Sequence, residues 1–225
     1  MKKCFILLLA MLVYHTLWSQ SRDNRKELRV INLLGAKVYE RPTFSSNILA
    51  ELPVGDVLKV ETSIETTEQF EVGAGFSFPG QWIKPQGIEG YIFSSDLTNK
   101  PLEIEISEQG GTYINLLGKL LSEKNEKEIV KTQNGEFPKH LEFKYYEYGT
   151  YSYTAWDGCF GHVTEYKNLS INEVYHQMVS DYGPVPAFQE KTGTIIKFES
   201  DGATQDLKIE IRENGTMVVS SYDCT

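Results

Sequence analysis

The stretch that decides the fold lies between Lys37 and Leu97, where short β-prone runs alternate with proline and glycine. It opens with Lys37-Val38-Tyr39-Glu40-Arg41-Pro42 and continues with Leu52-Pro53-Val54-Gly55-Asp56-Val57-Leu58-Lys59-Val60. Gly80-Gln81-Trp82-Ile83-Lys84 follows, and Gly90-Tyr91-Ile92-Phe93-Ser94-Ser95-Asp96-Leu97 closes it. Proline presets φ at about −65° and glycine tolerates positive φ, so these residues reverse the chain between strands. The spacing predicts a small all-β unit over residues 28–98.

This order of motifs resembles the bacterial SH3-like family, the SH3b domains. The residues that carry the resemblance are Val38 with Pro42, Leu52 to Val57, Trp82-Ile83-Lys84, and Gly90-Tyr91-Ile92 with Leu97. The chain departs from the family at Tyr39, where arginine is frequent, and in its long link from Val60 to Trp82. The resemblance implies a small SH3-like β-barrel that recognises a cell-wall peptide or a protein partner.

The long link is the first candidate for a binding surface. It combines glycine-rich backbone with three phenylalanines, which proteins seldom leave exposed without a cover. Three arrangements stay open: a long hairpin whose rings fold onto the barrel, docking onto the second domain, or contact with an external ligand. The candidate ligand contacts of the barrel are Tyr39, Arg41, Phe70, Phe76, Phe78, Trp82 and Tyr91.

A second domain is predicted over residues 102–225, after the polar link Asn99-Lys100-Pro101. From Leu102 to Ile106, apolar residues alternate with glutamate, which predicts a half-exposed antiparallel strand. The charged run from Glu123 to Glu128 favours an exposed turn or a short helix. Five tyrosines between residues 145 and 153 indicate strands around a reversal at Gly149-Thr150. Their rings serve either as cross-strand pairs or as a platform for carbohydrate.

One helix and three strands complete this domain. Ser170 followed by Glu173 matches a capping box, and Gly183-Pro184 ends the helix. Strands are expected over residues 193–199, 207–212 and 217–222, with Asn214-Gly215 as a type I′ hairpin turn. The whole chain is therefore expected to be mainly β, with an N-terminal SH3-like small β-barrel followed by an α+β domain in which one helix packs on an antiparallel sheet.

Residues 1–19 have the pattern of a secretory signal peptide. Lys2 and Lys3 precede an apolar run from Phe5 to Val13, and Ser19 suits a cleavage site. We expect an exported protein, periplasmic or extracellular, without stable membrane insertion. Loss of the two lysines leaves 20 basic against 31 acidic residues, a net charge of −11. An acidic chain without a basic run is unsuited to nucleic acid.

Two cysteines, Cys159 and Cys224, remain after removal of the signal peptide. In an oxidising compartment, a pair of cysteines is expected to form a disulfide. This one would tie the C-terminal strand to the middle of the second domain. The competing interpretation is a free and reactive thiol at Cys159.

Three functions are compatible with the sequence. The favoured one is a non-catalytic binding or scaffolding protein for a peptidoglycan peptide or an envelope protein, with no cofactor, no metal and no catalytic residue. The second is a cell-wall thiol peptidase or amidase using Cys159, although neither His162 nor His176 has the spacing of the Cys/His cell-wall peptidases. The third is a structural envelope protein whose barrel only docks the second domain.

Overall fold

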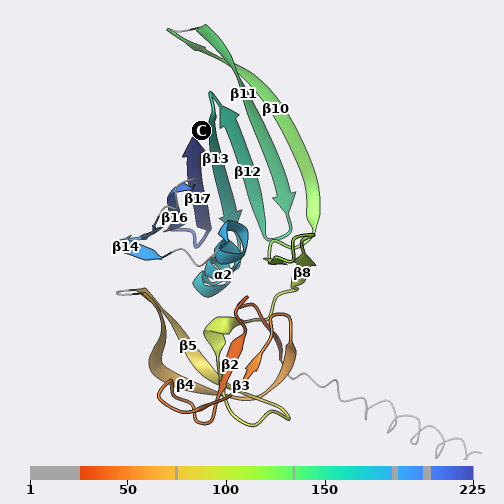
Figure 1. Cartoon of the computed structure of the whole chain (residues 1–225), viewed down its shortest axis with the longest axis vertical. Helices are drawn as coiled ribbons and strands as arrows, with labels where there is room; N and C mark the ends of the chain where they lie inside the picture. Colours follow the sequence, from red (N-terminus) through yellow and green to blue (C-terminus); the bar gives the residue numbers. More distant parts are fainter. Residues whose placement is uncertain (1–25, 74–75, 134, 184–186, 200–203, 225) are drawn as a thin grey trace, which may run out of the picture.

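The computed structural model describes residues 26–73, 76–133, 135–183, 187–199 and 204–224 (Figure 1). The predicted signal peptide lies outside these residues. The described chain is mainly β, and all its sheets are antiparallel. The first elements are β1 (Glu27–Val30), β2 (Ala36–Tyr39), β3 (Ile48–Leu52), β4 (Val57–Gly73), β5 (Phe76–Pro85), β6 (Ile92–Phe93), the 3-10 turn η1 (Ser94–Asp96) and β7 (Leu97–Thr98).

The remaining elements belong to the second half of the chain. They are β8 (Glu103–Ile106), β9 (Thr112–Asn115), β10 (Leu120–Thr132), β11 (Gly135–Tyr146), β12 (Gly149–Trp156), β13 (Cys159–Tyr166), α2 (Ile171–Tyr182), β14 (Phe188–Thr192), β15 (Ile195–Phe198), β16 (Gln205–Ile211) and β17 (Met217–Cys224). We refer to residues 26–98 as the N-terminal unit and to residues 99–224 as the C-terminal unit.

The N-terminal unit contains a five-stranded sheet in the order β6-β5-β4-β1-β7 and a separate β2–β3 pair. These pairings do not close into a barrel, so the structure shows antiparallel β structure here but not the expected SH3-like barrel. Val30, Val38 and Ile92 are fully buried in the unit's own core. Gly55 takes φ +89° in the predicted turn, where the Asp56 N–H donates to the Pro53 carbonyl at 3.2 Å.

The C-terminal unit is built on an eight-stranded sheet in the order β10-β11-β12-β13-β17-β16-β15-β14. Figure 1 shows α2 against one face of this sheet, between the sheet and the N-terminal unit. The β10–β11 hairpin is longer than its neighbours, since β12 pairs with β11 only from Lys139 to Tyr146. The rest of the hairpin projects as an arm at the top of the view (Figure 1).

One hydrophobic core spans both units. Phe76 and Phe78 of β5 are buried in the same cluster as Leu116, Tyr166 and Met178 of the C-terminal unit. The long link from Val60 to Trp82 thus forms the β4–β5 hairpin, and this hairpin also docks onto the C-terminal unit. Burial of large aromatic side chains is the main favourable term in such an interface, so the two units are joined by more than a linker.

The predicted helix is confirmed as α2. Glu173 accepts the backbone N–H of Ser170 at 2.7 Å, one half of the predicted capping box, and Gly183 ends the helix with φ +84°. Every residue from Glu173 to Ser180 is buried. The helix is covered on its polar side as well as its apolar side, because η1 and β9 pack against the polar residues.

The predictions for the charged run and for the last hairpin turn were wrong. Glu123 to Glu128 belongs to β10 and is neither a turn nor a helix, because β10 pairs with β11 along its length. Opposite charges face each other across that pair, as in Lys131 with Glu136 at 2.8 Å, and such pairs favour a strand. In the last hairpin, Gly215 has positive φ and Asn214 does not, which rules out a type I′ turn.

One strand and one turn lie differently from their sequence pattern. All four residues of β8 are exposed, Ile106 at 76%, and among the described strands β8 pairs only with β9. The reversal between β11 and β12 falls at Glu147-Tyr148, with Tyr146 opposite Gly149, and not at Gly149-Thr150.

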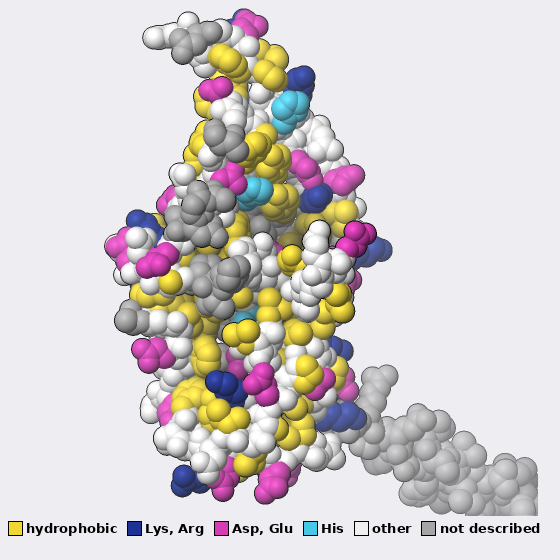
Figure 2. All heavy atoms as spheres, viewed as in Figure 1, with side chains coloured by type: hydrophobic (Ala, Val, Ile, Leu, Met, Phe, Trp, Pro, Cys, Tyr) yellow, Lys and Arg dark blue, Asp and Glu magenta, His cyan; other side chains and the backbone are white. Residues whose placement is uncertain are grey.

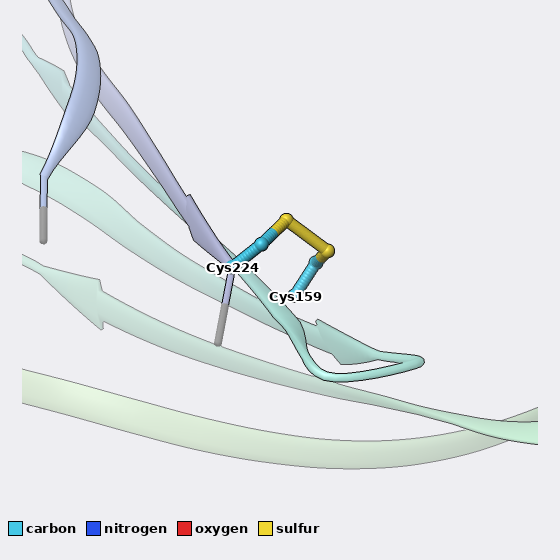
Figure 3. The surroundings of a disulfide bond; sticks show 2 residues. All are labelled: Cys159 and Cys224. Carbon is cyan, nitrogen blue, oxygen red and sulfur yellow. A yellow bond between two sulfur atoms is a disulfide. The ribbon is translucent and has the colours of Figure 1, made fainter.

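The predicted disulfide is present. Cys159 at the start of β13 and Cys224 at the end of β17 are direct cross-strand partners, with Cα atoms 4.0 Å apart (Figure 3). The bond fastens the C-terminal strand to the centre of the large sheet.

Candidate ligand-binding clefts at the unit junction and on the large sheet

The predicted ligand residues of the N-terminal unit fall into two groups. Trp82 is fully buried, its ring lies 5.3 Å from that of Tyr39, and its indole Nε1 donates to Glu68 Oε2 at 2.9 Å. Tyr39 and Tyr91 are half-buried and exchange two backbone hydrogen bonds of 2.7 Å. Arg41 is exposed beside them. Trp82 therefore supports this end of the unit from inside and offers no surface to a ligand.

Phe76 and Phe78 also require a correction as ligand contacts. Phe78 packs on Tyr175 of α2 with ring centroids 5.2 Å apart, and Phe76 stacks on Phe188 of β14 at 5.4 Å. Both are buried in the core that the units share, so an external ligand has no access to them. Phe70 is half-buried and remains at the edge of a cleft.

That cleft, the junction groove, has a volume of about 590 Å³ and lies between the units. Its apolar walls are formed by Leu33, Leu34, Phe70, Val72, Tyr113, Tyr175 and Val179. A few polar groups stand among them, notably Asn32, His176 and Ser180. Largely apolar walls with a small number of hydrogen-bonding groups are typical of ligand pockets, and the volume lies in their usual range.

A buried polar network links the two units beside this groove. His176 of α2 donates from Nε2 to the Ser95 carbonyl at 3.1 Å, and Asn172 Nδ2 donates to the same oxygen at 3.1 Å. Asn32 Nδ2 donates to Asp96 Oδ1 at 3.0 Å, and His176 lies 3.7 Å from that carboxylate. Burial raises the pKa of Asp96 to about 6 and lowers the pKa of His176 to about 4.

A second cavity, the Asp181 pocket, lies on the large sheet at the C-terminal end of α2. Its volume is about 400 Å³, and its polar and aromatic lining consists of Lys144, Tyr146, Tyr151, His162, Asp181 and Tyr182. A smaller hollow of about 280 Å³ adjoins it and shares Leu117, Tyr146 and Asp181. Tyr113 lines both the hollow and the junction groove.

The carboxyl group of Asp181 has neutral hydrogen-bonding neighbours and a raised pKa. It accepts a hydrogen bond from Gln177 Nε2 at 2.8 Å, and burial raises its pKa to about 7. The residue nevertheless keeps exposed surface in the pocket. Beside it, the Tyr166 hydroxyl is buried with no hydrogen-bond partner among the described residues, although Asp181 and Thr164 are close enough to influence its pKa.

The tyrosine-rich strands form cross-strand aromatic pairs. Tyr153 stands directly opposite His162, and its ring stacks on Phe160 with centroids 6.1 Å apart. The Tyr151 hydroxyl shares a 2.9 Å hydrogen bond with His162 Nδ1. Figure 2 shows hydrophobic and histidine side chains together on the face of the upper part of the molecule, which the large sheet forms. The cross-strand pairing stabilises the sheet, and the half-exposed rings leave its open face aromatic.

Cys159, the nucleophile of the thiol-hydrolase alternative, is not a free thiol in this structure. Cys159 is held in the disulfide, and a disulfide sulfur is not a thiolate nucleophile. His162 is hydrogen-bonded to Tyr151, and His176 lies in the interunit network. Asp157 occupies the turn between β12 and β13, at the opposite end of these strands from α2 and Asp181.

Comparison with known proteins returns no relative: no family model matches the chain, and no curated protein or solved structure matches it. Within the described part of the chain, none of the helices has the length and apolarity needed to span a bilayer.

Sequence reasoning found Phe70 but missed most of both cavities. The junction groove combines residues from β4, the loop after β1, β9 and α2, which are far apart in the chain. Asp181 and His176 lie on one helix and carry no motif that distinguishes them from solvated polar residues. The tyrosine density from Tyr145 to Tyr153 was the one usable signal for the Asp181 pocket.

Proposed function

We propose that this chain is an exported, non-catalytic binding protein whose junction groove holds apolar side chains of a peptide segment. The observation that carries the proposal is the groove itself, a cavity of about 590 Å³ with mainly apolar walls between the N-terminal strands and α2. Leu34 is 72% exposed at its edge and Tyr113 is 43% exposed. Exposed apolar side chains around an apolar cleft favour an apolar occupant.

The resemblance of the N-terminal unit to SH3b domains supports a peptide as that occupant. The strand and turn motifs quoted above are those of modules that recognise cell-wall peptides or protein partners. In this chain the unit would supply one wall of the groove through β4, while α2 and β9 supply the other. We propose the SH3-like barrel on the resemblance alone, and export on the pattern of residues 1–19.

The disulfide favours binding over the thiol-hydrolase alternative, because Cys159 carries no free thiol. The structural alternative, in which the N-terminal unit only docks the second, accounts for the buried Phe76 and Phe78. It does not account for an apolar groove left open beside them. Binding therefore explains more of the junction than docking alone.

The test is co-sedimentation of residues 20–225 with purified peptidoglycan sacculi. We expect the chain to sediment with sacculi, and Leu34→Glu to weaken the association by about tenfold, the equivalent of ~1.4 kcal/mol. Leu49→Glu is the matched control, because Leu49 is also exposed in the N-terminal unit but does not line the groove.

The outcomes distinguish the possible sources of the peptide. Failure of the unaltered chain to sediment contradicts a cell-wall peptide. Chemical cross-linking tests the other source. If it captures a protein partner, and this capture is lost in Leu34→Glu but kept in Leu49→Glu, the occupant of the groove is a peptide segment of that protein. If Leu34→Glu binds sacculi and captures the protein partner as well as the unaltered chain does, the groove is not the binding site.

A further inference from the structure

Asp181 is a carboxylate with no cationic partner among the described residues. Its neighbours are neutral: the amide of Gln177 donates a hydrogen bond to it at 2.8 Å, and the Tyr166 hydroxyl also acts on its pKa. The ammonium group in the same pocket belongs to Lys144, which is paired with Glu142 at 2.7 Å. A partly desolvated carboxylate is stabilised by an opposite charge, and the described residues supply none in contact with Asp181.

The position of Asp181 on α2 adds to the negative potential. It lies in the last turn of the helix, where the unpaired carbonyl groups carry a partial negative charge. No basic residue occupies that turn. The carboxylate and the helix end therefore act in the same direction, and both favour a cation in the pocket. The net charge of the chain, −9, has the same sign.

The aromatic lining favours an organic cation over a metal ion. Tyr146, Tyr151 and Tyr182 line the cavity with Asp181, and the face of a tyrosine ring attracts ammonium groups. The chain already places one ammonium there, since Lys144 Nζ lies 5.9 Å from the centre of the Tyr151 ring. A metal such as Ca²⁺ requires six to eight oxygen ligands, whereas this cavity contains one unpaired carboxylate.

The tyrosine rings are held in place before any ligand arrives. The Tyr151 hydroxyl is hydrogen-bonded to His162 Nδ1 at 2.9 Å, and the Tyr182 hydroxyl to Ser221 Oγ at 2.9 Å. Fixed rings lose little conformational freedom on binding, which favours affinity. A volume of about 400 Å³ suits a small organic group.

We propose that the Asp181 pocket binds an organic ammonium group, with the Asp181 carboxylate as its counter-ion and the rings of Tyr146, Tyr151 and Tyr182 around it. The pocket is separate from the junction groove, so this proposal stands or falls independently of the peptide proposed there.

The pocket should respond to pH through several groups. Burial raises the pKa of Asp181 to about 7, so the carboxylate that attracts the ligand forms as the pH rises through that value. The other charged or titratable groups that line the pocket or its adjoining hollow are Glu105, Tyr113, Lys144, Tyr146, Tyr151, His162 and Tyr182, and Glu142 and Tyr166 lie next to them. His162 lines the same pocket, and an Asp181→Asn variant separates its contribution from that of Asp181.

The experiment is a calorimetric and NMR titration of residues 20–225 with choline and with 3,3-dimethylbutan-1-ol, its neutral isostere. At pH 8 we expect choline to bind at least about tenfold more tightly than the isostere, since each factor of ten corresponds to ~1.4 kcal/mol. Asp181→Asn should reduce choline affinity by a similar factor, and the pH dependence near 7 should disappear.

A second variant predicts a change of the opposite sign. Lys144→Gln removes the competing ammonium and leaves Glu142 unpaired, so choline should bind several-fold more tightly. Lys139→Gln is its matched control: it makes the same charge change on β11, but Lys139 does not line the pocket. Asp157→Asn serves in the same way for Asp181→Asn.

The combined pattern decides the proposal even if one variant folds poorly. Equal binding of choline and its isostere, or no binding of choline, overturns it. Unchanged choline affinity in folded Asp181→Asn overturns it as well, and so does weaker binding in Lys144→Gln.

Discussion

Phe78 of β5 packs its ring against Tyr175 of α2, with the centroids 5.2 Å apart and the planes at 61°. The two residues come from different units of the chain, and both are buried in the core that the units share. This contact explains why the polar side of α2 is covered, since it brings η1 and its hydrogen-bonding groups onto the helix.

Removal of the Phe78 ring should destabilise the junction. Phe78→Ala deletes a fully buried aromatic side chain, a change that usually costs about 3–5 kcal/mol. We expect a lower urea midpoint and easier proteolysis between the units. Phe137→Ala, at a half-exposed site near the end of the β10–β11 arm, should change the midpoint little. Similar midpoints for the two variants would contradict a shared core.

The disulfide should contribute measurably to stability. It closes a loop with a sequence separation of 65 residues, and the chain-entropy model gives about 4 kcal/mol for such a loop. Urea unfolding of oxidised protein and of the Cys159→Ser, Cys224→Ser double variant measures this contribution. Oxidised protein should also show no reaction with iodoacetamide under native conditions. Rapid labelling of Cys159 in that protein would restore the thiol-hydrolase alternative.

Asp96 should make stability depend on pH. Its pKa is about 6 in the folded chain and 3.8 in its ordinary state, so the folded chain binds the proton more tightly, and stability falls as the pH rises through this interval. Asp96→Asn removes this loss. The free energy of unfolding of the variant minus that of the unaltered chain should therefore increase from pH 4 to pH 8, by no more than about 3 kcal/mol.

His176 acts in the opposite direction over a similar range. Its folded pKa is about 4 against an ordinary value of 6.5, so stability rises with pH through that interval. Comparison of Asp96→Asn with the unaltered chain largely cancels this contribution, because His176 is present in both. Unfolding by urea at several pH values gives the difference. A difference that does not change with pH would show that Asp96 titrates normally.

Two glycines of the same loop should differ sharply in their tolerance of alanine. Gly90 has φ +110°, and an added Cβ would lie 2.6 Å from the Tyr39 carbonyl oxygen. Gly87 has φ +75° with open space around it. Gly87→Ala should cost about 1 kcal/mol from backbone strain alone. Gly90→Ala should cost clearly more, because the β2 backbone must also move. Thermal unfolding of both variants tests this order, and equal losses would contradict it.

Elements with strong local patterns were predictable from the sequence. The helix α2 was predictable, because the capping box of Ser170 and Glu173 satisfies backbone N–H groups of its first turn and Gly183 ends it. Both signals act regardless of what packs around the helix. The Pro53–Gly55 turn belongs to the same class, whereas the Cys159–Cys224 pair followed from the presence of just two cysteines after residues 1–19. β10 was not predictable, because its alternating charges become strand-forming only when β11 lies beside them.

The sequence by itself determined that this chain is mainly β with one capped helix, because turn residues, caps and alternation act between near neighbours. The tertiary structure alone decided that the polar side of α2 is buried and that Phe76 and Phe78 lie between the units. It also placed Asp181 in one pocket with Tyr146 and Tyr151. These arrangements depend on the docking of segments that are far apart in the sequence, and no local pattern records which surfaces will meet.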